Sequence, residues 1–75
     1  MIFRTYDTVD NTLKNWEKQL NIASKKKFRL YENSEDTLKE WCRILNKYNS
    51  SNLRIYETPE KTISMWANQL TFLFK

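Results

Sequence analysis

Three pairs of acidic residues could carry out acid–base catalysis, because two neighbouring carboxyl groups can work as general acid and general base. Within each pair the residues are three positions apart, and a residue type that commonly caps helices lies between them. A helix dipole favours negative charge at the helix N-terminus whatever the function, so we expect these carboxylates to stabilise helices. The pairs are Asp7 with Asp10, Glu32 with Glu35, and Glu57 with Glu60.

The residue types that most enzymes need are missing from this chain. Its 75 residues include no His, which removes the usual base of a hydrolytic triad and the commonest zinc ligand. They include no Gly, so no glycine-rich loop can cradle a phosphate. The one Cys, Cys42, can form neither an internal disulfide nor a Cys-rich metal site, and we expect a partly buried, ordinary thiol. We therefore expect no enzymatic activity, no cofactor, no metal and no small-molecule substrate.

An internal repeat is the strongest signal in the sequence. The chain divides into three units of 25 residues, 1–25, 26–50 and 51–75, which align without any insertion. Such agreement indicates a duplication or deliberate symmetry. It also predicts one domain, since a single unit of this length has too little apolar surface to fold alone. Five positions are identical in all three units: Arg4/Arg29/Arg54, Tyr6/Tyr31/Tyr56, Thr12/Thr37/Thr62, Trp16/Trp41/Trp66 and Leu20/Leu45/Leu70.

Each unit predicts a short strand followed by a helix. The first part, such as residues 28–31, alternates residue types with period two and is rich in strand-forming residues. The second part follows a capping residue and places Leu13, Trp16 and Leu20, with their equivalents, on one helical face. We therefore expect the three Trp in the core rather than on a stacking platform. The expected caps are Thr8, Asn33 and Thr58, and Pro59 suits the first helical position.

Three strand–helix units predict an α/β fold. Right-handed crossovers would join three parallel strands into a small sheet with all helices packed on one face. The strand residues that alternate toward the helices are Phe3 and Thr5, Phe28 and Leu30, and Leu53 and Ile55. The other sheet face would carry the Arg-x-Tyr pairs, which are Arg4 with Tyr6, Arg29 with Tyr31, and Arg54 with Tyr56.

The Arg-x-Tyr pairs have two interpretations. In the structural one, each Tyr packs on the Trp of its unit and each Arg pairs with a neighbouring carboxylate. In the functional one, the six side chains form a single partner-binding surface, since Arg and Tyr are enriched among the residues that dominate binding energy. We take this surface as the predicted site.

Two further segments differ from their surroundings. Lys25, Lys26 and Lys27 precede the second predicted strand and would contact phosphates or an acidic partner, or else remain solvated loop residues. The C-terminal residues 70–74 are mostly apolar, unlike the polar return segments of the first two units. They would extend the last helix and cap the core, or dock on a partner.

These features predict a small, non-enzymatic interaction protein of the inhibitor or adaptor type that binds a protein partner or a second copy of itself. The formal net charge of +4 is spread along the chain, which leaves nucleic-acid binding through the same Arg/Tyr face and the lysines as the alternative. The abundance of Asn, Lys and Ile in so short a chain is typical of phage or mobile-element proteins. No apolar run is long enough to span a membrane and no signal-peptide pattern is present, so we expect a cytoplasmic protein without membrane contact.

Overall fold

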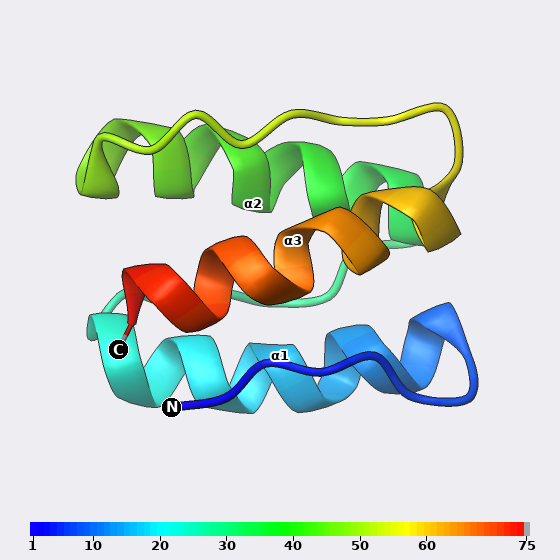
Figure 1. Cartoon of the computed structure of the whole chain (residues 1–75), viewed down its shortest axis with the longest axis horizontal. Coiled ribbons are helices and arrows are strands. Elements are labelled where there is room, and N and C mark those ends of the chain that lie inside the picture. Colours follow the sequence, from blue (N-terminus) through cyan, green and yellow to red (C-terminus); the bar gives the residue numbers. More distant parts are fainter. Residues whose placement is uncertain (75) are drawn as a thin grey trace.

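The helices predicted from the sequence are confirmed. The computed structural model describes residues 1–74, and these form three α-helices joined by extended segments (Figure 1). Each helix begins after the predicted capping residue, whose side chain accepts a hydrogen bond from the backbone N–H three positions ahead. The helices are α1 (Val9–Ser24), α2 (Ser34–Asn49) and α3 (Pro59–Leu73), with caps at Thr8, Asn33 and Thr58.

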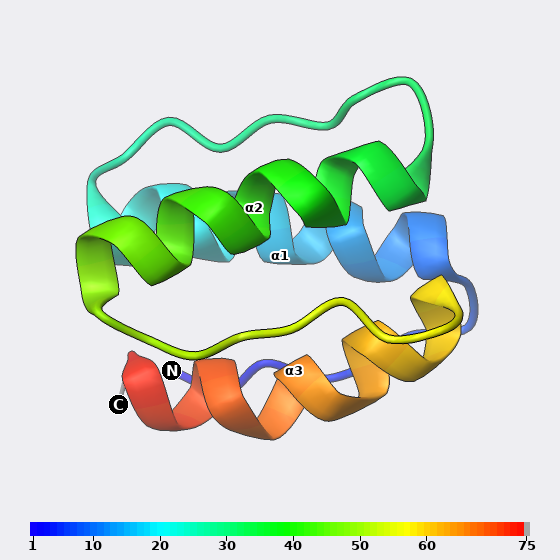
Figure 2. The same cartoon turned by 90° about the horizontal axis from the view of Figure 1, so that it is seen from above.

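The predicted sheet, and with it the α/β fold class and the β–α repeat, is wrong. No strand forms within residues 1–74. The segments 1–7, 26–32 and 51–57 are extended but do not pair with one another, because each lies between two helices (Figure 2). Several of their backbone groups bond to helix side chains instead of to neighbouring strands. The molecule is a compact, all-helical bundle.

The helices and the extended segments alternate around a ring. All three helices run in the same direction, and each extended segment returns the chain to the end at which the next helix begins (Figures 1 and 2). Segment 26–32 lies between α1 and α2, segment 51–57 lies between α2 and α3, and segment 1–7 lies between α3 and α1. The segments are therefore held apart on three sides of the molecule.

Two buried side chains of each helix hold the extended segment of the same unit. In the second unit, the Thr37 hydroxyl accepts a hydrogen bond from the Tyr31 N–H at 2.9 Å and donates to the Asn33 carbonyl at 3.0 Å. The Trp41 indole donates to the Arg29 carbonyl at 2.9 Å. Equivalent bonds recur in the first and third units. These bonds explain why Thr and Trp are identical in every unit.

A different side chain holds each segment to the preceding helix. The Asn21 amide accepts from the Phe28 N–H at 2.6 Å and donates to the Phe28 carbonyl at 3.0 Å. Asn46 makes the same two bonds with Leu53. At the junction that closes the ring, the Thr71 hydroxyl takes this place and accepts from the N–H of Phe3 at 2.8 Å. The chain ends are joined to each other in the same manner as consecutive units.

The core lies on the axis of the ring. The three Trp side chains are completely buried, as predicted, and each helix adds two further apolar side chains around them. Every extended segment contributes one buried residue, Phe3, Phe28 or Leu53. The Phe3 and Phe28 rings meet the Trp of their own units edge to face, with ring centroids 5.8 Å apart in both cases.

Candidate functional site

The structure does not bring the six Arg-x-Tyr residues together, because their segments lie on three sides of the ring. All three Arg side chains are exposed, Tyr6 is exposed, and Tyr31 and Tyr56 are half-buried. The single Arg/Tyr surface predicted from the sequence required a sheet, and each pair must now be considered with its own helix.

The structural interpretation of these pairs agrees with their contacts only in part, since Tyr56 packs against the buried core that contains the three Trp. The edge-on ring contacts to Trp16 and Trp41 come from Phe side chains. The ion pairs within residues 1–74 join Arg43 to Glu40 and Lys61 to Glu57, so none of the three Arg side chains takes part. The Arg29 guanidinium instead lies 4.9 Å from the centroid of the Tyr31 ring.

The acidic pairs lie at the helix N-termini, as expected. Every carboxylate except Glu17 and Glu40 is in or just before the first turn of a helix. A hydrogen bond from the Asn11 amide lowers the pKa of Asp7. Within the described residues no cluster of His, Cys, Asp or Glu could hold a metal ion. The arrangement places negative charge where the helix dipoles favour it.

Cys42 lies at the junction of α2 with the third extended segment. Its half-buried thiol donates to the Leu53 carbonyl at 3.3 Å and accepts from the Asn46 amide at 3.4 Å. Burial raises the pKa of the thiol, which favours the neutral form. The contacts of Cys42 are those of a packing residue.

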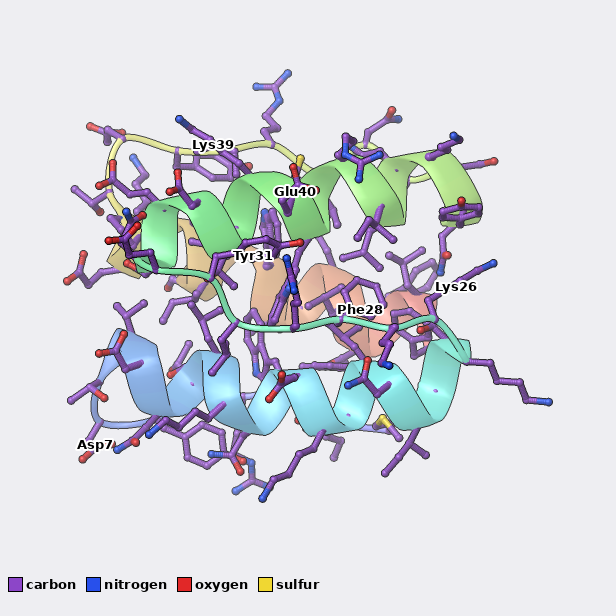
Figure 3. All side chains as sticks on the ribbon, turned by 180° about the vertical axis from the view of Figure 1, so that it is seen from behind. Asp7, Lys26, Phe28, Tyr31, Lys39 and Glu40 are labelled. Carbon is purple, nitrogen blue, oxygen red and sulfur yellow. The ribbon has the colours of Figure 1, made fainter. Side chains whose placement is uncertain are left out.

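The lysine cluster lies at the end of the molecule where the helices finish. Lys25, Lys26 and Lys27 are exposed, and the Lys26 ammonium lies 4.1 Å from the centroid of the Tyr48 ring. Lys47 approaches the same ring at 5.6 Å. Figure 3 shows Lys26 at the opposite end from Asp7. The lysine cluster therefore lies far from the carboxylates at the helix N-termini, while the other basic residues are spread along the chain.

The outer surface of α3 differs chemically from those of α1 and α2. Residues 62–74 contain no charged side chain. Where α3 has Ser64 and Asn68, the equivalent positions are basic in both other helices. The exposed side chains Met65, Asn68, Gln69 and Phe72 form a surface that we call the α3 face. The basic residues that α3 lacks are Lys14 and Lys18 in α1, and Lys39 and Arg43 in α2.

The α3 face combines exposed apolar side chains with a shallow groove. Phe72 is 75% exposed and Met65 is 46% exposed. A shallow groove of about 450 Å³ runs beside Phe72, between α3 and the start of the third extended segment, and Leu53 and Leu73 form part of its lining. The same segment carries Arg54, which is fixed along α3 because its carbonyl accepts the Trp66 indole N–H at 2.8 Å. The backbone of Arg54 therefore lies beside α3, whereas Tyr56 lines a separate hollow with Leu38 and Lys39 of α2.

Sequence reasoning singled out the apolar C-terminal residues 70–74 but not the longer charge-free run, residues 62–74, that contains the α3 face. Residues 70–73 belong to α3, and Leu70 is completely buried while Phe72 is exposed, so the segment contributes to both the core and the surface. No helix in the described part of the chain is long and apolar enough to cross a membrane. No protein-family model, curated protein or solved structure matches this chain.

Proposed function

We propose that this chain is a non-enzymatic interaction protein that binds a protein surface through the α3 face. The observation that carries the proposal is that residues 62–74 carry no charged side chain, whereas α1 and α2 carry basic residues on the corresponding outer surfaces. Interface cores are depleted in Lys and enriched in Met, aromatic residues and Arg. The α3 face has exposed Met65 and Phe72, and the exposed Arg54 follows Leu53 in the extended segment beside α3.

Arg54, in the segment beside the face, fits the rim of an interface. Its guanidinium can hydrogen-bond there while the apolar side chains lose their contact with water. The proposal retains Arg54 as a partner-binding residue and assigns no common surface to the other five residues of the Arg-x-Tyr pairs. An inhibitor or adaptor acting in the cytoplasm fits such a module, and the lone Cys42 is compatible with a reducing compartment.

Site-specific photo-cross-linking tests this proposal. A photoreactive amino acid is placed at position 65 and, as matched controls, at the equivalent positions Asn15 on α1 and Glu40 on α2. We expect protein adducts in living cells from position 65 and markedly fewer from the controls, with the adducts identified by mass spectrometry. Equal yields from all three positions, or none from position 65, would contradict the proposal.

Nucleic-acid binding is a second candidate, favoured by the charge of one extended segment. Residues 25–29 include Lys25, Lys26, Lys27 and Arg29 and no carboxylate, although Glu32 follows Tyr31, and Arg29 lies over the Tyr31 ring. Such a strip would place cations on phosphates beside an aromatic ring for a base. Binding to single-stranded RNA or DNA should then weaken steeply with salt. If Arg29→Ala and Tyr31→Ala leave the affinity unchanged, this candidate is lost.

A further inference from the structure

We infer that the protein surface bound by the α3 face is the α3 face of a second copy of this chain, in a twofold-symmetric dimer. This inference rests on the proposed function and names the partner for the same site. It depends on three observations: the absence of charge, the presence of self-pairing amides, and the protrusion of apolar side chains beside a hollow.

Charge decides which surface of this molecule can meet its own copy. The chain carries a net charge of +4, so two copies repel each other unless their charged side chains stay apart and solvated. The outer surface of α1 would bring Lys14 and Lys18 toward the same residues of a second copy, and α2 would bring Lys39 and Arg43. The four residues of the α3 face are uncharged, so the nearest cations, Arg54 and Lys61, can stay at the solvated edge of such a contact.

The polar residues of the α3 face can pair with their own copies. A carboxamide group carries both donors and an acceptor, so Asn68 and Gln69 can each hydrogen-bond to an identical or similar amide. A lysine or a carboxylate facing its copy has no such option. The amides lie between Met65 and Phe72 along the helix, which makes the middle of the face polar and its two ends apolar.

The spacing of the face suits antiparallel helix packing. Positions 65, 68, 69 and 72 follow the i, i+3, i+4, i+7 pattern by which helices contact one another. A twofold axis between Asn68 and Gln69 would set Met65 against Phe72 of the second copy, and Phe72 against its Met65. An interface of this kind uses the same patch on both subunits and closes at a dimer.

The groove beside Phe72 gives the face its complementary hollow. Its volume of about 450 Å³ exceeds that of a single side chain, and Leu53 and Leu73 provide part of an apolar lining. A protruding Met or Phe side chain of the second copy would displace water from this lining. One surface thus contains both the protrusion and the hollow that a self-complementary contact needs.

The available area points to a weak dimer. A standard interface buries roughly 800 Å² per partner. The solvent-accessible surface of the chain is 5105 Å², so the α3 face with its flanking segments would have to supply about one sixth of it. A single-helix contact lies at or below that size. We therefore expect a dissociation constant on the order of 10 µM.

Analytical ultracentrifugation from about 1 to about 500 µM tests the dimer. Phe72→Lys is compared with Ile22→Lys, since Ile22 occupies the equivalent position on α1 and is 74% exposed, against 75% for Phe72. We expect the parent chain and I22K to dimerise alike. We expect F72K to weaken the dimer by about tenfold or more, since it places a charge in the interface. Because the residues of the α3 face are uncharged, the parent dimer should persist at high salt.

A parent chain that is monomeric over this range, or equal effects of F72K and I22K, would overturn the inference. Met65→Lys serves as a second variant, with circular dichroism confirming that each variant is folded. Ultracentrifugation and the cross-linking experiment together separate this inference from the proposed function. A monomer that still gives adducts with another protein from position 65 would refute self-pairing alone, whereas a monomer without such adducts would refute both.

Discussion

The hydroxyl of Thr37 should be worth more to stability than its size suggests, because it completes the backbone hydrogen bonding of an extended segment. It is almost fully buried, accepts from the Tyr31 N–H at 2.9 Å and donates to the Asn33 carbonyl at 3.0 Å. In Thr37→Val the shape and β-branching are kept, so the change isolates the hydroxyl. The Asn33 carbonyl still accepts the backbone N–H of residue 37, at 3.1 Å. The N–H of Tyr31 is therefore the group left unsatisfied.

The magnitude follows from two opposing terms. A partly buried N–H that loses its partner costs about 1–3 kcal/mol. The additional methyl group of Val recovers at most about 0.8 kcal/mol by burial. We expect T37V to lower the free energy of unfolding by about 1–2 kcal/mol. This is a large part of the stability of a domain of this size, which is about 5 kcal/mol.

Urea denaturation measures the loss, and amide hydrogen exchange assigns its cause. The Tyr31 N–H should exchange much faster in T37V than in the parent, after correction for global stability. Thr37→Ser is the matched control, because it keeps the hydroxyl and removes a methyl, and it should retain the protection of Tyr31. A T37V variant within about 0.5 kcal/mol of the parent, or one in which Tyr31 stays protected, would refute the reasoning.

Three further predictions concern the junctions between units. Thr71→Asn should raise the free energy of unfolding by about 1 kcal/mol, measured in urea. The one Thr71 hydroxyl hydrogen is shared between the Ala67 carbonyl at 2.8 Å and the Phe3 carbonyl at 3.3 Å. An Asn amide at this position can donate fully to the Phe3 carbonyl, as Asn21 does to Phe28. Ser50→Gly should raise it by about 0.5 kcal/mol, since Ser50 has a φ of 52° and Gly adopts this conformation without strain; no gain would contradict this. Burial raises the pKa of Cys42, so its stabilising contribution is present below the pH at which an unfolded thiol ionises and is lost as the pH rises through the folded pKa. The urea midpoint of the parent should therefore fall at alkaline pH more than that of Cys42→Ala.

The helices and the core were predictable because their signals are local. A capping residue followed by an apolar face of period 3.6 specifies a helix wherever it occurs, and Thr8 and Trp41 met this expectation in position and burial. The fixed 25-residue offset then supplied the other two helices.

The extended segments were misassigned because their pattern is shared by two structures. A segment with one side on a core and one side in water alternates with period two, whether or not it pairs with a strand. Phe28 and Arg29 show this alternation while bonding to side chains of α1 and α2. The distinguishing signal was the Thr at position 37 and its equivalents, a polar residue placed next to the apolar face of each helix. A buried hydroxyl inside a helix can donate to the carbonyl four residues back, as Thr37 does to Asn33, and its oxygen is then free to accept from the extended backbone.

The grouping of the Arg-x-Tyr pairs was not predictable, because it depended on strand order, and no strand exists in residues 1–74.

The chemistry of α3, by contrast, can be recognised in the sequence when the three units are compared position by position. Packing and capping impose the same requirements on every unit, so they account for what the three copies share. They do not account for why α1 and α2 keep basic residues where α3 has Ser64 and Asn68. A difference confined to exposed positions of one unit has no source in the symmetric fold. We therefore look for the function of this chain where its symmetry fails, on the α3 face.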